Sequence, residues 1–466
     1  MNETTLQTYP PEASGGGSAL RKVLMIAYAF PPTGGPGVQR PAKFAKYLSR
    51  FGWIPTVWTV DVAQGLPRDA SLLDDLPPDV TILTQGAGGA VASVRRKLRG
   101  FLDSAPSSVA SRFAAALDWR LQAWHTAASF PDDCASWAKQ SIAPLTRLIE
   151  RENIEVIFST LSPPSNHLLG LELKRRTHRP WVADFRDLWT DDYRYNEPSS
   201  RRRAAHRRFE QEVLDEADAV VGVAPRQTRI LAERTVDQSD KYFTITNGFD
   251  PDDFLGPAPT RASSDQRFVL TYVGRLDLVR THDELFAGLQ EFADRNDVTP
   301  ERFLLRIVGH ANTETQGRIR ATGLPCEFLN YVDHTEAVRE MRSADALFLI
   351  APNGPNAETV ICAKVFEYLA ARKPILVVGP ADGECERIVQ DCHAGVSVTF
   401  DQTEIAGAMG RLFDAWRAGS PCPGARPESY QRYSRIEQTR KLVSVFDRVA
   451  GDAATSAVAF GEAHVR

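Results

Sequence analysis

Residues 357–378 read AETVICAKVFEYLAARKPILVV, a pattern that indicates a polar loop, a helix, a short break and an apolar strand. The helix carries Lys364 and Glu367, which are three residues apart and therefore share one helix face. The loop follows another apolar run, Ala346–Ile350, and an open α/β sheet binds ligands just beyond such strand ends. A helix N-terminus there can bind a phosphate, and a nearby carboxylate can accept hydrogen bonds from ribose hydroxyls. The pattern alone favours this nucleotide site no more than a surface Lys–Glu pair on an amphipathic helix.

The rest of the chain repeats this alternation of short apolar runs with longer helical patterns, which is typical of a parallel sheet with crossover helices. The predicted strands are Lys22–Tyr28, Pro55–Val60, Val80–Leu83, Glu155–Thr160, Trp181–Asp184, Ala219–Val223, Tyr242–Thr246, Phe268–Val273, Phe303–Val308, Glu327–Asn330, Ala346–Ile350, Pro374–Val378 and Gly395–Val398. Residues 251–265 hold three prolines and one glycine without periodicity, so they indicate an interdomain linker. The predicted fold class is α/β, with two Rossmann-like doubly wound domains facing across a cleft.

The domain boundaries follow from these strands and from the linker. Ser434 and Glu437 have the spacing of a capping box, which indicates that a helix begins there. The polar ends of the chain are expected to be disordered. The predicted segments are a disordered tail (1–20), an N-terminal Rossmann-like domain (21–250), the linker (251–265), a C-terminal Rossmann-like domain (266–430), a C-terminal helix (431–450) and a second disordered tail (451–466).

Composition limits the class of protein. The 55 Lys and Arg against 59 Asp and Glu give a net charge of −4, so the chain lacks the strong positive charge of a nucleic-acid-binding protein. Its 6 cysteines are scattered without a Cys-x-x-Cys pair, which favours reduced thiols in the cytoplasm. The polar N-terminus lacks the apolar core of a signal peptide, and no run approaches the ~18 apolar residues of a membrane span. We therefore expect a cytoplasmic protein with no nucleic-acid partner.

The segment around Lys364 resembles the nucleotide-sugar segment of family 4 glycosyltransferases, which are retaining enzymes of the GT-B fold. That family has two spaced glutamates, of which the second contacts the ribose of the donor. Glu367 matches the second glutamate, whereas Thr359 stands in the place of the first. Some branches carry a Lys-x-x-Glu-Tyr-Leu version, which Lys364, Glu367, Tyr368 and Leu369 match. The resemblance implies that Thr359, Lys364 and Glu367 bind the donor.

Other predicted strand ends in the second half also match the family. Gly274 permits close backbone approach, and Arg275 can form two hydrogen bonds with a diphosphate. The family pairs this arginine with a lysine, for which Arg280 is a substitute here; the alternative is two surface arginines. Gly309 and Tyr331 lie in loops that resemble those framing the donor base. The resemblance implies that Arg275 and Arg280 stabilise the leaving diphosphate, and that Gly274, Gly309 and Tyr331 bind the donor.

A glycine-rich loop follows the first predicted strand. Gly34, Gly35 and Gly37 lie between that strand and a predicted helix, an arrangement that can place backbone N–H groups against an anion. The loop matches neither the classical dinucleotide fingerprint nor a P-loop. The alternative is a tight turn that only needs glycine. Family 4 enzymes have a similar loop near the donor diphosphate and the acceptor, so the resemblance implies that role.

Two further strand ends in the first half carry polar residues. His167 could contact the acceptor; the alternative is that Ser165 caps a helix and His167 packs on its first turn. Arg186 and Asp187 follow the strand at Trp181–Asp184, and Arg186 stands where the family often has a histidine. We predict that Arg186 or Asp187 takes over that catalytic contact. The alternative is a local Arg–Asp salt bridge.

The resemblance implies a hexosyltransferase-like enzyme that moves a sugar from a nucleoside diphosphate sugar to a sugar or lipid-linked acceptor with retention, in polysaccharide or glycolipid assembly. No cofactor is expected. No metal site is predicted either, because cationic side chains can neutralise the leaving diphosphate. Two alternatives remain open, a GT-B nucleotide-sugar epimerase using acids such as Asp184 and Asp187, and a non-catalytic nucleotide-sugar-binding module. The missing first glutamate motivates the second alternative.

Basic and aromatic residues gather in Val94–Trp124, and Arg201–Arg208 adds a second basic run. Such a mixture is found in helices that lie on a membrane surface. One interpretation is peripheral contact with the inner membrane surface through the N-terminal domain. The alternative is a pair of solvated helices packed on the core, and the pattern does not decide between the two.

Overall fold

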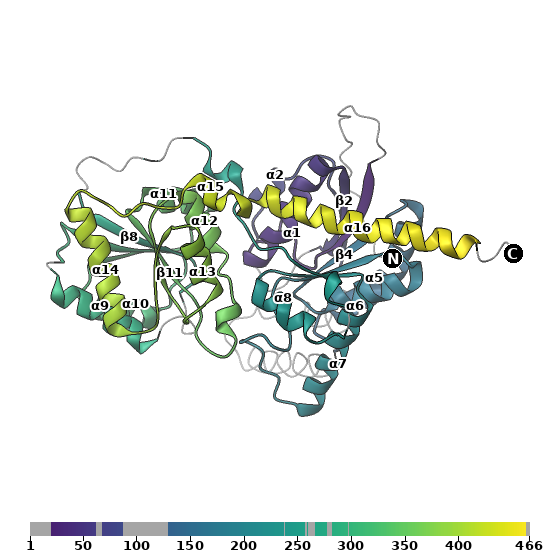
Figure 1. The fold of residues 1–466 in the computed structure, drawn as a ribbon, viewed down its shortest axis with the longest axis horizontal. Helices are drawn as coiled ribbons and strands as arrows, with labels where there is room; N and C mark the ends of the chain where they lie inside the picture. Colours follow the sequence, from purple (N-terminus) through teal and green to yellow (C-terminus); the bar gives the residue numbers. More distant parts are fainter. Residues whose placement is uncertain are drawn as a thin grey trace, which may run out of the picture. The chain divides into compact units, whose positions relative to one another are not determined.

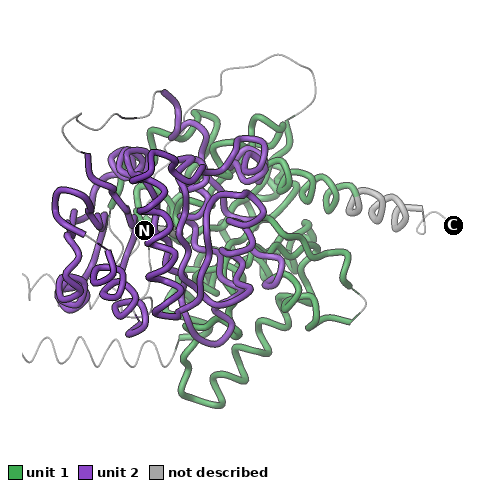
Figure 2. Tube along the Cα trace, turned by 60° about the vertical axis from the view of Figure 1, so that its left-hand side comes forward, with its two compact units in different colours: residues 1–223, 228–245, 439–466 green, residues 224–227, 246–438 purple. Residues whose placement is uncertain are grey.

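The computed structural model describes residues 20–61, 68–86, 129–236, 238–256, 259, 266–276, 282–296 and 298–462, with side chains except at 36 and 452–462. It divides into two compact units. Unit 1 comprises residues 1–223, 228–245 and 439–466, and unit 2 comprises residues 224–227 and 246–438 (Figure 2).

Unit 1 is built on a parallel sheet of 7 strands in the order β3-β2-β1-β4-β5-β6-β7. This order is that of a doubly wound Rossmann sheet, with its switch point between β1 and β4. The elements are β1 Arg21–Ile26, α1 Pro36–Leu48, η1 Ser49–Phe51, β2 Trp53–Val60, α2 Ser71–Asp74, β3 Thr81–Gln85, α5 Ala135–Arg151, β4 Val156–Leu161, α6 Ser165–Thr177, β5 Trp181–Phe185, α7 Ser200–Glu216, β6 Ala219–Gly222, α8 Pro225–Ala232, η2 Ser239–Lys241 and β7 Tyr242–Thr244 (Figure 1).

Unit 2 repeats the design with 6 parallel strands in the order β10-β9-β8-β11-β12-β13, so its switch point lies between β8 and β11. The elements are η3 Pro251–Phe254, β8 Phe268–Val273, α9 Asp283–Arg295, β9 Phe303–Val308, α10 Thr313–Ala321, β10 Cys326–Leu329, α11 His334–Ser343, β11 Ala346–Ile350, η4 Ala357–Thr359, α12 Lys364–Ala371, β12 Ile375–Val378, α13 Glu384–Asp391, β13 Gly395–Val398, α14 Gln402–Arg417, α15 Pro427–Tyr430 and η5 Gln431–Tyr433. The last helix, α16 Arg435–Glu462, begins in unit 2 and continues in unit 1. The predicted class of two doubly wound α/β sheets is confirmed.

Each sheet is buried on both faces. In β1, Val23 and Met25 belong to one apolar cluster, whereas Leu24 and Ile26 belong to another. Successive side chains of a strand point to opposite faces, so this alternation means that helices cover both sides of the sheet. The same alternation divides β11 between the two clusters of unit 2. Continuous apolar runs, rather than alternating ones, are therefore what the sequence shows at these strands.

Helix α16 begins at Arg435, and the Ser434 hydroxyl accepts a hydrogen bond from the backbone N–H of Glu437 at 3.2 Å. This bond is one half of the predicted capping box, because the Ser434 backbone N–H donates to the Gln431 carbonyl rather than to the Glu437 side chain. From Thr439 onward the helix belongs to unit 1. There Phe446 packs edge-on against Trp53, with ring centroids 5.3 Å apart, and joins the apolar cluster of β1. The last helix thus completes one face of the first sheet.

Candidate functional site

The strand order of unit 2 brings the predicted donor residues to one edge of its sheet. Gly274 and Arg275 follow β8, and Gly309 follows the neighbouring β9. Gly309 has a φ of +115° and lies against Gly274, whose carbonyl oxygen occupies the space that a side chain would need. Gly309 is therefore required for the two strand ends to approach each other. Arg275 is exposed at this edge, and its carbonyl accepts a hydrogen bond from the Tyr272 hydroxyl at 2.9 Å.

Three other predicted donor residues have different surroundings. Thr359 lies in η4 with only 2% of its surface exposed, and its hydroxyl donates to the Asn356 carbonyl at 2.7 Å. The hydroxyl therefore stabilises the loop. Tyr331 follows β10 and is 75% exposed, which leaves its ring accessible to a ligand. Arg280 lies outside the described residues.

Lys364 and Glu367 form an ion pair on the first turn of α12, with 2.5 Å between the Lys364 Nζ and Glu367 Oε2. Their side chains are 31% and 17% exposed, so the pair is partly buried but open to the surface. Burial raises the pKa of Glu367, but the positive charges of Lys364 and His334 outweigh this effect and hold that pKa below its usual value. Glu367 is therefore an ionised hydrogen-bond acceptor at neutral pH.

His334 and Asp253 were not singled out from the sequence, yet the structure places them beside this pair. His334 is the first residue of α11, and its Nε2 lies 2.8 Å from the Asp253 Oδ2 of η3. Arg435, at the start of α16, is 5% exposed and bonds the Asn247 side chain at 3.3 Å. The charge of Arg435 also acts on Glu367. Such pairs bring together distant parts of the chain, so no local pattern could have revealed them.

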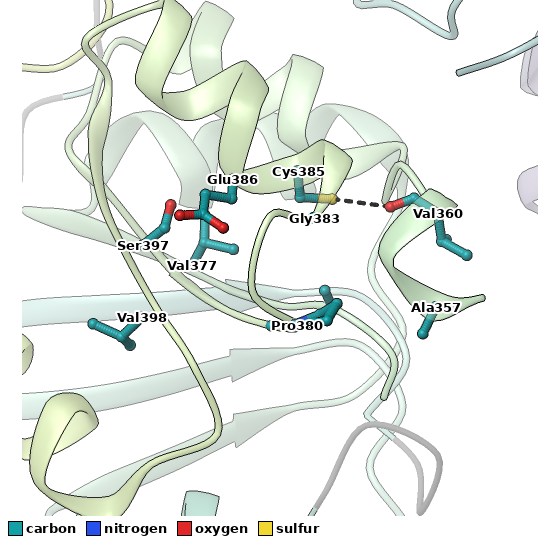
Figure 3. A pocket seen from close by; sticks show the side chains of 11 residues that line it. Ala357, Val360, Val377, Pro380, Gly383, Cys385, Glu386, Ser397 and Val398 are labelled. Atoms are coloured by element: carbon teal, nitrogen blue, oxygen red, sulfur yellow. Dashed lines mark hydrogen bonds between the residues drawn. The ribbon is translucent and has the colours of Figure 1, made fainter. Parts of the chain in front are cut away.

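A small cavity lies beside the strand ends of β12 and β13 (Figure 3). Its volume is about 10 Å³, which is room for about one water molecule. Cys385 lines it and donates a weak hydrogen bond from Sγ to the Val360 carbonyl at 3.5 Å. Ser397 also lines it, and the Ser397 hydroxyl is buried without a hydrogen-bond partner among the described residues. A nucleotide is far too large for this cavity, so the cavity itself is not a nucleotide site.

The strand ends of unit 1 bring together two of the predicted elements. The Arg186 guanidinium donates to the Gly37 carbonyl and occupies the space that a side chain at Gly37 would need. The glycine-rich loop and the end of β5 are thus in direct contact. Gly34 lies in this loop, and Gly35 caps α1 with a φ of +109°, a conformation that favours glycine.

Asp187 is held between two arginines. Its carboxylate lies 3.7 Å from the Arg186 Nε and 3.1 Å from the Arg194 Nη2. Burial raises the pKa of Asp187, and the two arginines only partly oppose this. The predicted alternative of an Arg186–Asp187 salt bridge is therefore present, with Arg194 as a further partner. About a third of the Asp187 side chain remains exposed, which keeps it accessible.

His167 requires a correction, because the structure places it in the core rather than at the surface. The ring is 0% exposed, lies 4.8 Å from the Phe185 ring and bonds the Ser159 hydroxyl through Nδ1 at 2.8 Å. Burial lowers the pKa of His167 to about 3, so it is neutral. The structure therefore fits the alternative interpretation, in which His167 packs on the first turn of the helix. Ser165 is not the helix cap, however, because the Ser165 hydroxyl donates to Asp132 at 2.7 Å.

A buried ion pair joins α1, the helix that follows the glycine-rich loop, to the sheet of unit 1. Arg40 of α1 bonds Asp184 of β5 through two nitrogens, at 2.7 Å from Nη2 and 3.0 Å from Nε. The side chains are 2% and 0% exposed. Asp184 also accepts from the Thr160 hydroxyl at 2.6 Å, and Arg40 donates to the Ile245 carbonyl at 2.9 Å. The pair therefore ties α1 to β5, to β4 and to the residue that follows β7.

Among the described residues, no group of three His, Cys, Asp or Glu side chains is arranged to hold a metal ion. None of the helices in the described part of the chain is long and apolar enough to span a bilayer.

Known proteins resemble this chain in sequence and in fold. Residues 23–248 match the family model of the glycosyl transferase 4-like domain. No curated protein gives a significant sequence match. Among solved structures, Anabaena HepE in complex with UDP and glucose is 14% identical, with a TM-score of 0.58 over 92% of this chain and 100% of that one.

Two other solved structures share this fold. Sucrose-phosphate synthase from Thermosynechococcus elongatus is 14% identical, with a TM-score of 0.53 over 95% of this chain and 100% of that one. A Listeria monocytogenes protein assigned as a UDP-N-acetylglucosamine 2-epimerase is 12% identical, with a TM-score of 0.52 over 92% of this chain and 96% of that one. The match to the family model and the shared two-sheet fold agree with the resemblance at Lys364 and Glu367. The chain therefore carries a glycosyl transferase 4-like domain at residues 23–248 and has the two-sheet fold of GT-B glycosyltransferases.

Proposed function

We propose that this protein transfers a hexose from a nucleoside diphosphate sugar to a sugar or lipid-linked acceptor with retention of configuration, in polysaccharide or glycolipid assembly. The observation that supports this most is the Lys364–Glu367 pair at the open strand-end edge of unit 2. Glu367 would accept hydrogen bonds from the ribose, and Lys364 would contact a phosphate. Arg275, together with Arg280, would stabilise the leaving diphosphate, an electrostatic effect that commonly dominates such reactions.

Unit 1 would bind the acceptor. Arg186 and Asp187 lie at the end of β5 beside the glycine-rich loop, where they could orient a sugar hydroxyl. We assign no nucleophile, so the acceptor would attack the same face from which the diphosphate departs, within a short-lived ion pair. His167 has no part in this proposal, because its ring is buried.

A screen of nucleotide sugars for thermal stabilisation of the protein tests this proposal. UDP and GDP sugars are added separately to the protein, and the unfolding temperature is measured. One of them should raise it, because a ligand that binds only the folded protein stabilises it by mass action. UDP-glucose comes first in the screen, since HepE, which shares the fold, was crystallised with it. If no nucleotide sugar raises the unfolding temperature at millimolar concentration, the proposal fails.

An epimerase is the second candidate, because a UDP-N-acetylglucosamine 2-epimerase has the same fold. An epimerase needs acids that can remove a proton from the sugar. Asp184 is fully buried and bound to Arg40 and Thr160, so it is not accessible for that task. Asp187 remains accessible. Incubating the donor without any acceptor separates the candidates, because only an epimerase would change the sugar under that condition.

We expect sugar transfer to survive chelation. Arg275 and Lys364 are cations at the proposed donor site, and they can neutralise the charge that develops on the diphosphate. The assay is run with excess EDTA, and again after magnesium or manganese is restored. Full activity in EDTA is the expected result. Complete loss that either metal reverses would show that a metal ion supplies this charge instead.

We also expect the protein to bind anionic vesicles at low salt. Arg201, Arg203, Arg207 and Arg208 are exposed on α7, whereas Val94–Trp124 lies outside the described residues. Basic side chains contribute ~1 kcal/mol each near an anionic surface, and salt screens this attraction. Co-sedimentation should therefore fall as salt rises, and should weaken when Arg201, Arg207 and Arg208 are changed to Gln. Failure to sediment at low salt would favour a soluble acceptor.

A further inference from the structure

His334 connects the proposed donor site to a second carboxylate. It begins α11, which packs against both η3 and α12. Its Nε2 lies 2.8 Å from the Asp253 Oδ2, and the two side chains are 25% and 20% exposed. Because both groups are largely buried, their interaction is less screened by solvent than a surface pair would be. The imidazole is therefore held in a defined position next to α12.

The charged groups that act on His334 come from two elements. Asp253 is on η3, and Glu367 and Lys364 are on α12. The hydrogen bond with Asp253 raises the pKa of His334 above the usual 6.5, burial opposes this, and the Glu367 charge adds to the rise. His334 in turn lowers the pKa of Glu367. The protonated imidazole and the Glu367 carboxylate therefore stabilise each other.

The Lys364–Glu367 pair presents a conflict for donor binding. At 2.5 Å the Lys364 ammonium is engaged with the carboxylate, yet the donor needs Lys364 at a phosphate and Glu367 at the ribose. Turning Lys364 toward the phosphate leaves a partly buried carboxylate without its nearest cation, which is unfavourable. Another positive charge near Glu367 would reduce that cost. Arg435 supplies a permanent one, and His334 supplies one that depends on pH.

We propose that protonated His334, held by Asp253, is a positioning residue that stabilises the Glu367 carboxylate while Lys364 turns toward the diphosphate of the donor. This inference rests on the proposed function, since it requires a nucleotide sugar at Glu367. It assigns to His334 and Asp253 a role in donor affinity rather than in the transfer step.

The proposal predicts how affinity depends on pH. A histidine whose pKa is raised is protonated below that pKa and loses its charge as the pH rises through it. Donor affinity should therefore be highest at about pH 6 and fall through a step that lies above the 6.5 of an ordinary histidine. The expected loss across the step is about three- to tenfold, which is typical of coupling between neighbouring charges.

The test is a calorimetric titration of UDP-glucose, or of the GDP sugar that the screen selects, between pH 6 and 8.5. A nucleotide sugar is used because its diphosphate, unlike that of UDP, has no proton to lose in this range. The proteins are the parent, His334→Gln, Asp253→Asn and the control His393→Asn. His393 is exposed in unit 2 and has a φ of 49°, which Asn tolerates.

Four results are expected. The parent and His393→Asn show the step, His334→Gln binds at the parent's high-pH affinity throughout, and Asp253→Asn moves the step to lower pH. Ring resonances of His334 in the parent should titrate at the pH of the step. A parent without a step, or a step that persists in His334→Gln, would overturn the inference and leave the proposed function intact. Absence of nucleotide-sugar binding at every pH would overturn both.

Discussion

Glu367→Ala is expected to bind the donor nucleotide sugar about ten- to a hundredfold more weakly than the parent, because losing hydrogen bonds to a charged acceptor costs ~1.5–3 kcal/mol. Glu367 is ionised and partly open at the strand-end edge of unit 2, where a ribose could reach it. The fold should survive, since an ion pair between residues three apart on a helix contributes only ~0.2–0.5 kcal/mol. Calorimetric titration measures the affinity, and thermal unfolding measures the stability.

Glu314→Ala is the matched control for this prediction. Glu314 is an exposed acid in the first turn of α10, in the same unit but outside the proposed site. Its removal takes away the same charge, so a general electrostatic effect would lower the affinity of both variants equally. Equal affinities for Glu367→Ala and the parent would remove Glu367 from the donor site.

Asp184→Ala is expected to lower the free energy of unfolding of unit 1 by about 3–5 kcal/mol, because it leaves the charge of Arg40 buried without its partner. The pair is almost fully buried, and Asp184 also accepts a hydrogen bond from the Thr160 hydroxyl. Asp187→Ala is the control: its partners Arg186 and Arg194 lie nearer the surface, where such pairs contribute less than about 1 kcal/mol.

Urea denaturation compares the unfolding midpoints of Asp184→Ala, Asp187→Ala and the parent. A large shift for Asp184→Ala alone is the expected outcome. Replacing the ion pair by an apolar pair, as in the double variant Arg40→Met with Asp184→Leu, should recover part of the lost stability, because no buried charge is then left unpaired. If Asp184→Ala unfolds at the same urea concentration as the parent, Asp184 does not anchor α1 to the sheet.

The strands could be predicted from the sequence because their signal is local. Runs such as Phe268–Val273 and Ala346–Ile350 are apolar without interruption, as expected for strands covered on both faces, and the structure has strands with these bounds. The ion pair of Lys364 and Glu367 was equally readable, since helical spacing alone brings them together. The Ser434 cap of α16 belongs to the same class of short-range signals.

The remaining features of the candidate site depend on contacts between distant residues. Arg40 meets Asp184 across 144 positions, and His334 meets Asp253 across 81. No periodicity records such pairs, because the crossover connections of the fold create them. His167 illustrates the opposite failure: a histidine after a strand end has the same local pattern whether its ring faces solvent or the core. Its burial follows from the packing of Trp181 and Phe185 around it.

The measurement that tests the account most directly is hydrogen exchange of the protein with and without the nucleotide sugar that the screen selects. The donor is proposed to bind unit 2, at the ends of β8 and β9 and on the first turn of α12. Peptides that contain Gly274, Gly309 and Lys364–Glu367 should therefore exchange more slowly with the sugar bound, and Glu367→Ala should reduce this protection at the same concentration. Protection confined to peptides of unit 1, with unit 2 unchanged, would contradict the account.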